Sequence, residues 1–226
     1  MEKDVTLEER SVRQLNQQGL EFVRIRRARI EDVPVLARLH LEVLPTAFLP
    51  LLGERFLRRL FRAQVEAGDA VAVVAERNGQ VIGYSTGVVS TSAFRRRFLL
   101  RHGIPAALAV VPRLLRPRIL RRLLETTTYP EKTKELPEAE WMLVGVRPGT
   151  APGLGTELGK EVLAGLAALG VKEVKGFVAC DNRAMNWMVR RMGFEQRGEI
   201  SIHDGRPSNV YVIQCHSSSP SFSRSS

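Results

Sequence analysis

The sequence has few cysteines and no long apolar run, and each scarcity excludes a class of protein. Its 226 residues include two cysteines, Cys180 and Cys215, which lie far apart and without a nearby histidine cluster. That pattern argues against a disulfide framework and against a zinc site. No apolar run approaches the roughly 20 residues that span a bilayer, and the N-terminus is charged. We therefore expect a cytoplasmic protein without a metal, a secretory signal or a membrane-spanning helix.

Acidic residues are missing from residues 95–124, a segment that contains nine arginines. This basic segment accounts for nearly all of the formal net charge of +10. It could be a solvated helical lid over the core, a site where arginine forks bind the phosphate of an anionic acceptor, or a surface that contacts an anionic membrane. Nucleic acid is the less favoured partner, because no reading motif or aromatic stacking platform accompanies the charge.

The length and the 44% of hydrophobic residues predict one main domain. We expect residues 1–20 to be a flexible N-terminal segment and the serine-rich residues 216–226 to be a disordered tail. Residues 21–215 would form the domain, with the arginine-rich insertion at about 93–130. The prolines of the basic segment predict two or three short helices there, and residues 126–137 have the composition of a loop.

Hydrophobic periodicity predicts the order of elements in the domain. Strands are expected at 22–26, 69–77, 80–89, 140–146, 171–180, 195–203 and 209–214, and helices at 32–43, 56–65, 154–169 and 182–192. Asn78 and Gly79 favour the type I′ turn of a tight hairpin between the second and third strands. This order indicates a mixed α/β (α+β) domain with a sheet of six or seven strands.

The glycine-rich run from Val146 to Gly159 connects an expected strand to an expected helix. Gly153 and Gly155 would let a ligand approach the backbone, and the N–H groups of a helix N-terminus attract anions. The run is either an ordinary loop or a cradle for a phosphate.

This run, together with Asp181 to Ala184 and the later Gly193–Phe194, resembles the GNAT superfamily of acyl-CoA-dependent N-acyltransferases over residues 22–214. The resemblance implies a mostly antiparallel sheet, flanked by helices and splayed between its fourth and fifth strands. Acetyl-CoA, the co-substrate, would lie in the splay, with its pantetheine amides on the backbone of Val144 and Val146.

The same resemblance assigns further contacts with the cofactor. The pyrophosphate would rest on the segment Thr150, Ala151, Gly153, Leu154, Gly155 and Thr156. Asn182 would hold the pantetheine arm, or would simply cap the following helix. Glu140 is the best-placed carboxylate to act as the base, with Glu138 second, although an acid at the start of a strand is also often only exposed.

The chain departs from the family pattern at two positions. Thr150 stands where an arginine or glutamine is usual, and Arg147 or Lys160 would have to supply the missing charge. Val189 stands where many relatives carry the tyrosine that protonates the leaving thiolate, which leaves water, Tyr129 or Tyr211 for that step.

We therefore expect an N-acetyltransferase that acts on a primary amine of a small molecule, such as an amino sugar or its nucleotide-linked or lipid-linked form. The alternative is a non-catalytic acyl-CoA-binding or membrane-associated interaction protein with a degenerate fold. The sequence leaves the acceptor, the acyl chain length and the choice between a monomer and a homodimer open. It also leaves open whether the protein is peripheral to a membrane.

Overall fold

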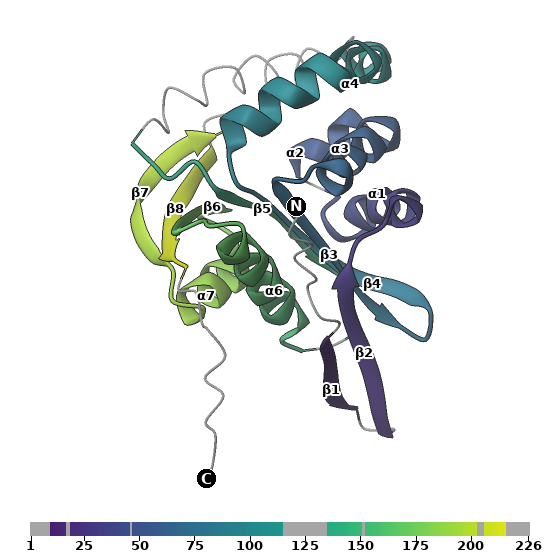
Figure 1. The fold of residues 1–226 in the computed structure, drawn as a ribbon, viewed down its shortest axis with the longest axis vertical. Coiled ribbons are helices and arrows are strands. Elements are labelled where there is room, and N and C mark those ends of the chain that lie inside the picture. The colour runs from purple at the N-terminus through teal and green to yellow at the C-terminus, as the bar shows by residue number, and fades with distance from the viewer. Residues whose placement is uncertain are drawn as a thin grey trace, which may run out of the picture.

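The computed structural model describes residues 10–16, 19–45, 47–114, 135–150, 152–202 and 206–215 (Figure 1). Its strands are β1 (Arg10–Asn16), β2 (Gly19–Arg27), β3 (Ala70–Arg77), β4 (Gln80–Val88), β5 (Glu140–Val146), β6 (Glu173–Ala179), β7 (Glu195–Ile202) and β8 (Arg206–Gln214). Its α-helices are α1 (Val33–Val43), α2 (Phe48–Leu52), α3 (Glu54–Glu66), α4 (Thr91–Leu114), α6 (Leu154–Ala168) and α7 (Arg183–Arg191). A 3₁₀ turn at Ile30–Asp32 leads into α1. The expected tail at 216–226 and most of the expected loop at 126–137 lie outside the described residues.

The strands form one sheet in the order β1-β2-β3-β4-β5-β6-β8-β7, and β5–β6 is its parallel pair. Six or seven strands were expected, and the additional strand is β1, within a segment predicted to be flexible. Residues 10–16 lack an apolar period, yet they pair with β2 along their whole length, from Arg10 opposite Ile25 to Asn16 opposite Gly19. An edge strand is held by its backbone hydrogen bonds, so a polar sequence does not prevent it from forming.

The hairpin of β3 and β4 has the predicted turn. Asn78 and Gly79 have φ angles of 51° and 76°, as a type I′ turn requires at both central residues. Residues 70–75 of β3 are all apolar and buried, because both faces of the sheet are covered there. Val73 packs in the cluster under α6, whereas Val74 packs in the cluster under α1 and α3.

Helices cover the two faces of the sheet separately, and Figure 1 shows α6 and α7 on one side and α1, α3 and α4 on the other. Leu158, Val162 and Leu166 of α6 are fully buried and form the inner side of this helix. Helix α6 lies so close to β4 that a Cβ at Gly87 would come within 2.7 Å of Val162 Cγ1. The close packing of α6 on the sheet thus fixes the helix start that carries the glycine-rich turn.

Helix α4 differs from the prediction. Residues 91–114 form one helix that includes Pro105 and Pro112, where two or three short helices were expected. A proline removes one hydrogen bond of a helix and bends it, but it does not always end it. Phe94 is buried against α3, and Phe98 contacts Phe56 with ring centroids 5.9 Å apart. These aromatic contacts hold the first half of α4 against the domain.

Strands β5 and β6 are splayed, as expected for the central pair of this fold. The two strands pair at one position, where Glu140 lies opposite Lys175. There the Lys175 N–H donates to the Ala139 carbonyl at 2.9 Å. A bulge in β5 accompanies the separation. Thr86 of β4 lies opposite Leu143 but Gly87 lies opposite Trp141, so Met142 is the extra residue. A bulge bends its strand, and here it lies just beyond the last residue of β5 that pairs with β6.

Candidate acyl-CoA site

The gap between β5 and β6 opens from the Glu140–Lys175 pair toward the C-terminal ends of both strands. Its narrow part is a crevice lined by apolar side chains of β5, β6 and α7 and by Tyr211 of β8. The glycine-rich turn follows β5, and Asn182 follows β6, so both lie at the open end of the gap. The structure therefore brings the predicted strand edge, turn and asparagine to one wedge-shaped site.

Hydrogen bonds on the other edge of β5 reveal which of its backbone groups face this gap. The Arg147 N–H donates to the carbonyl of Ile82 in β4 at 2.8 Å. Opposed residues of antiparallel strands alternate between bonded and non-bonded pairs. By that alternation, the N–H and C=O groups of Val144 and Val146 point away from β4 and into the gap. An extended ligand with amide groups would find donors and acceptors there, as predicted for pantetheine.

The glycine-rich turn presents the N-terminus of α6 at the open end. Gly153 is the N-cap, with a left-handed φ of 81°, and no side chain caps the helix. The N–H groups of Thr156 and Glu157 turn back to the Gly153 carbonyl at 3.0 and 3.2 Å. The N–H groups of Leu154 and Gly155 are then the ones that project from the helix end. N–H groups at a helix N-terminus suit an anion, and binding of a phosphate by these two groups stays a prediction.

Thr150 and Ala151 precede the cradle. Ala151 lies outside the described residues. The Thr150 hydroxyl donates to the Arg147 carbonyl at 2.6 Å, so this hydroxyl is already engaged inside the turn. Backbone N–H groups are thus the main donors that the turn offers to an anion.

A guanidinium that the sequence did not single out lies beside the cradle. Arg77 ends β3, and its Nη1 lies 3.4 Å from the Thr150 carbonyl oxygen. The two cations that were expected to assist are engaged elsewhere: Arg147 pairs with Glu42 of α1 at 3.0 Å, and Lys160 pairs with Glu157 at 2.9 Å. Of these three cations, Arg77 is the one whose guanidinium contacts the backbone of the turn. Only the register of the hairpin could have indicated it, because Arg77 is far from the turn in the sequence.

Asn182 has the capping role that the sequence allowed. Its Oδ1 accepts a hydrogen bond from the Met185 N–H at 3.1 Å, at the start of α7. The neighbouring buried amide of Asn186 was missed. Its Nδ2 donates to the carbonyls of Ala179 and Asn182 at 2.9 and 2.8 Å, which ties α7 to the end of β6. Binding of pantetheine by Asn182 stays a prediction.

Glu140 lies at the closed end of the gap and is only 9% exposed. The Thr91 hydroxyl, at the start of α4, donates to its Oε2 at 3.0 Å. Lys175, on the paired position of β6, is 3% exposed, and burial lowers the pKa of its ammonium while the nearby carboxylates of Glu140 and Glu138 oppose that shift. A lysine within an apolar strand is the sequence signal that could have revealed this partner.

Glu138, the second candidate base, is placed differently. Its Oε2 accepts hydrogen bonds from the Ser92 and Ser90 hydroxyls at 2.8 and 2.9 Å, at the N-terminus of α4. These hydrogen bonds lower the pKa of Glu138, and the bond from Ser92 has the larger effect. The lower pKa makes Glu138 a weaker proton acceptor. Glu138 is thus engaged at the start of α4, whereas Glu140 is buried at the closed end of the gap.

Of the two tyrosines proposed to protonate the leaving thiolate, Tyr211 lies within the described residues. Val189 is buried, and Tyr211 lies beside it in the crevice. The Tyr211 hydroxyl donates to Asn186 Oδ1 at 2.9 Å and accepts from Arg190 Nε at 3.1 Å. It is held toward α7 by both bonds. Tyr129, the other candidate, lies outside the described residues.

Among the described residues, no three His, Cys, Asp or Glu side chains gather in a way that could hold a metal ion. None of the helices within the described ranges is long and apolar enough to cross a membrane.

No protein-family model matches the sequence, and a search of curated proteins finds no match. Solved structures are nevertheless similar to it. A GNAT-family acetyltransferase from Bacillus cereus ATCC 10987 is 11% identical, with a TM-score of 0.55 over 86% of this chain and 98% of its own. The Escherichia coli ribosomal-protein-S18-alanine N-acetyltransferase is 12% identical, with a TM-score of 0.54 over 88% of this chain and 97% of its own.

A third similar structure, yncA from Salmonella typhimurium, was solved with its cofactor acetyl-CoA. It is 14% identical, with a TM-score of 0.53 over 86% of this chain and 94% of its own. Each of the three similar chains is covered almost completely, so the resemblance extends over a whole domain. The strand order, the splay at the parallel pair and these similarities together identify the fold of this chain as that of the GNAT superfamily of acetyltransferases.

Proposed function

We propose that the protein is an acyl-CoA-dependent N-acyltransferase that moves an acetyl group from acetyl-CoA to a primary amine of a small acceptor. The observation that carries the proposal is the wedge between β5 and β6, which has a buried carboxylate at its closed end and an uncapped helix N-terminus at its open end. A long ligand with amides in the middle and phosphates at one end matches those groups in that order. Acetyl-CoA is such a ligand, and a similar structure contains it.

The residues of this chain would divide the work as follows. Leu154 and Gly155 bind the pyrophosphate through their N–H groups, with Arg77 beside them, and the backbone of Val144 and Val146 bonds the pantetheine amides. The thioester then reaches toward the closed end of the gap.

In the reaction, the amine nitrogen attacks the thioester carbonyl carbon, a C–N bond forms and the C–S bond breaks. Glu140 accepts the proton that the amine loses, and the CoA thiolate leaves and takes a proton from water. The Thr91 hydroxyl orients the Glu140 carboxylate by a hydrogen bond, and the buried Lys175 ammonium adds an electrostatic attraction. The chain mainly positions two substrates, because the thiolate is an acceptable leaving group near neutral pH.

For the acceptor we propose an amino sugar, free or linked to a nucleotide or a lipid. Support comes from α4, which begins at Thr91 next to Glu140 and continues into the basic segment. Arginine side chains in that position suit a phosphorylated acceptor.

A titration tests the proposal in two stages. Thermal unfolding with increasing acetyl-CoA should raise Tm, because a ligand that binds the native state stabilises it. Release of free thiol is then measured with a panel of amines that includes amino sugars with and without phosphate and an N-terminal alanine peptide. Thiol release that depends on the amine supports the proposal. Binding without turnover would point to a non-catalytic acyl-CoA-binding protein, and the absence of any Tm shift would refute both.

A further inference from the structure

Exposed apolar side chains are concentrated on one helix. Among the described residues, four large hydrophobic side chains are strongly exposed, and three of them are on α4: Leu99 at 60%, Leu100 at 80% and Ile104 at 79%. The fourth, Trp187, lies on α7 at the other end of the domain (Figure 1). Single exposed apolar residues are ordinary on a protein surface, but three neighbouring ones mark an interaction site.

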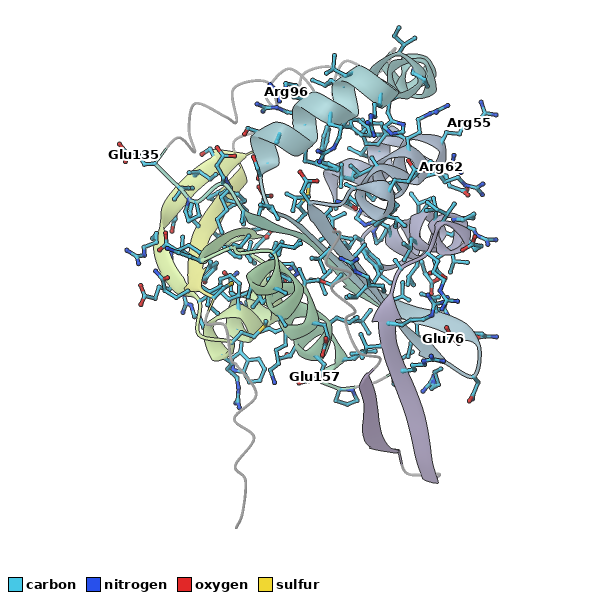
Figure 2. The ribbon with its side chains drawn as sticks, in the orientation of Figure 1. Arg55, Arg62, Glu76, Arg96, Glu135 and Glu157 are labelled. Atoms are coloured by element: carbon cyan, nitrogen blue, oxygen red, sulfur yellow. The ribbon has the colours of Figure 1, made fainter. Side chains whose placement is uncertain are left out.

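The exposed residues of α4 form a stripe opposite its packed side. Arg96, Leu100 and Ile104 follow one another at intervals of four residues, and Leu99 is three residues from Arg96, so these four share one face. Phe94 lies four residues before Phe98, and both rings face the domain. Figure 2 shows the Arg96 side chain projecting outward from α4. The helix therefore has an inner aromatic side and an outer aliphatic side.

Positive charge borders this outer face. At 100° per residue, Arg95 and Arg101 lie on the two flanks of the stripe, and Arg96 lies within it. Arg97 pairs with Asp69 at the start of β3, so its charge is balanced. The sequence then adds five more arginines and no acid up to residue 124. An aliphatic stripe between arginines is typical of helices that lie on the surface of an anionic membrane.

Other occupants fit this face less well. A second copy of the chain would bring Arg95, Arg96 and Arg101 against their own equivalents, and like charges repel. Single-stranded nucleic acid needs exposed aromatic rings for its bases, whereas the exposed side chains here are aliphatic. An anionic bilayer satisfies both features, because phosphates attract the arginines and the acyl boundary accepts the leucine and isoleucine tips.

We infer that the outer face of α4, formed by Arg95, Arg96, Leu99, Leu100, Arg101 and Ile104, docks the protein on an anionic membrane surface. Because α4 begins at Thr91 beside Glu140, docking would hold the closed end of the acyl-CoA gap near that surface. The inference concerns binding alone and does not depend on the proposed transferase activity.

Sedimentation of the full chain with vesicles tests the inference. One set of vesicles is phosphatidylcholine alone, and the other is an equimolar mixture of phosphatidylcholine and phosphatidylglycerol. The wild type should pellet with the mixed vesicles and stay in solution with the neutral ones. Added salt should weaken the binding, because it screens the arginine–phosphate attraction.

Two double variants separate the apolar contribution from the charge. Leu100→Gln with Ile104→Gln should weaken the vesicle partition at least about tenfold, because both aliphatic tips are lost. Arg96→Gln with Arg101→Gln should weaken it about tenfold or more and should reduce its salt dependence. All four positions are exposed or half-buried on one helix face, so Tm should change little, which the thermal unfolding curve of each variant checks.

Matched controls lie elsewhere on the chain. Arg55→Gln with Arg62→Gln removes the same charge from α3, where both side chains project into solvent in Figure 2. Trp187→Gln removes the exposed apolar side chain of α7. Both controls should bind like the wild type. The inference is overturned if the wild type ignores the mixed vesicles, if it binds neutral vesicles equally, or if the controls lose as much binding as the α4 variants. Self-association without lipid that the α4 variants abolish would instead assign the face to a second copy.

Discussion

Replacement of Gly153 by alanine separates the role of the glycine-rich turn in folding from its role in binding. Gly153 has a φ of 81°, and a Cβ placed there would meet nothing within 4 Å. The substitution therefore creates no clash, and its cost to folding is the left-handed strain of an alanine, about 1–2 kcal/mol. For a domain of this size that cost lowers Tm by about 2–8 °C.

The same methyl group has a second effect if the turn binds an anion. A phosphate held by the Leu154 and Gly155 N–H groups would lie close to Gly153, and the added methyl group would then crowd it. A hydrogen bond to a charged group contributes about 1.5–3 kcal/mol. Loss of one such bond should raise the KM for acetyl-CoA at least about tenfold, with a smaller change in kcat.

Gly170 provides the matched control, at the other end of the same helix. Its φ is 86°, and its Cβ would also meet nothing within 4 Å. Gly170→Ala should therefore lower Tm like Gly153→Ala while the KM for acetyl-CoA stays at the wild-type value. Thermal unfolding and initial rates of thiol release measure both effects on the same preparations. Equal KM values for the two variants would refute the assignment of the turn as the phosphate cradle.

Three further predictions concern the base, the charge beside the cradle and a buried histidine. Glu140→Gln should lower kcat about 100-fold and flatten the rising limb of the plot of kcat/KM against pH; an unchanged profile would remove Glu140 from the mechanism. Arg77→Met should raise the KM for acetyl-CoA about fivefold, whereas Arg147→Met, which removes a guanidinium already paired with Glu42, should leave it unchanged; the reverse order would contradict the geometry. Burial lowers the pKa of His40 from 6.5 to about 4, so the unfolded chain takes up a proton that the native state does not, and the free energy of unfolding should fall by about 3 kcal/mol from pH 6.5 to 4. His40→Gln should remove that part of the pH dependence in urea titrations, and an identical slope in both proteins would show that His40 is not the cause.

Local chemistry made part of this structure predictable. The turn at Asn78 and Gly79 needs two residues that tolerate positive φ. Few residue pairs do so, and these two residues alone were therefore enough to predict the hairpin. The helix start after Gly153 is similar, because a glycine-rich turn before an amphipathic stretch has few other structural outcomes. Val144 and Val146, by contrast, were assigned to the site by the resemblance to the GNAT superfamily, and the strand pairing turns their backbone groups toward the gap.

The rest depends on tertiary packing, which no local pattern contains. Strand β1 exists because β2 offers it an edge, and its own residues show no period. Arg77 approaches the cradle through the register of the β3–β4 hairpin, which extends past the end of β5. Lys175 faces Glu140 because of a single parallel pair. The prolines of the basic segment predict breaks, yet α4 continues through Pro105 and Pro112.

Strands β5 and β6 are joined at a single residue pair, so that pair can act as a hinge between the two halves of the sheet. Glu140 and Lys175 form the hinge, and the strand ends at Val146 and Ala179 lie farthest from it, at the open end of the gap. Any change in the angle between the two halves of the sheet moves atoms in proportion to their distance from the hinge. Glu140 would therefore move least and the glycine-rich turn most, so a large ligand entering at the open end would leave the groups at the closed end in place.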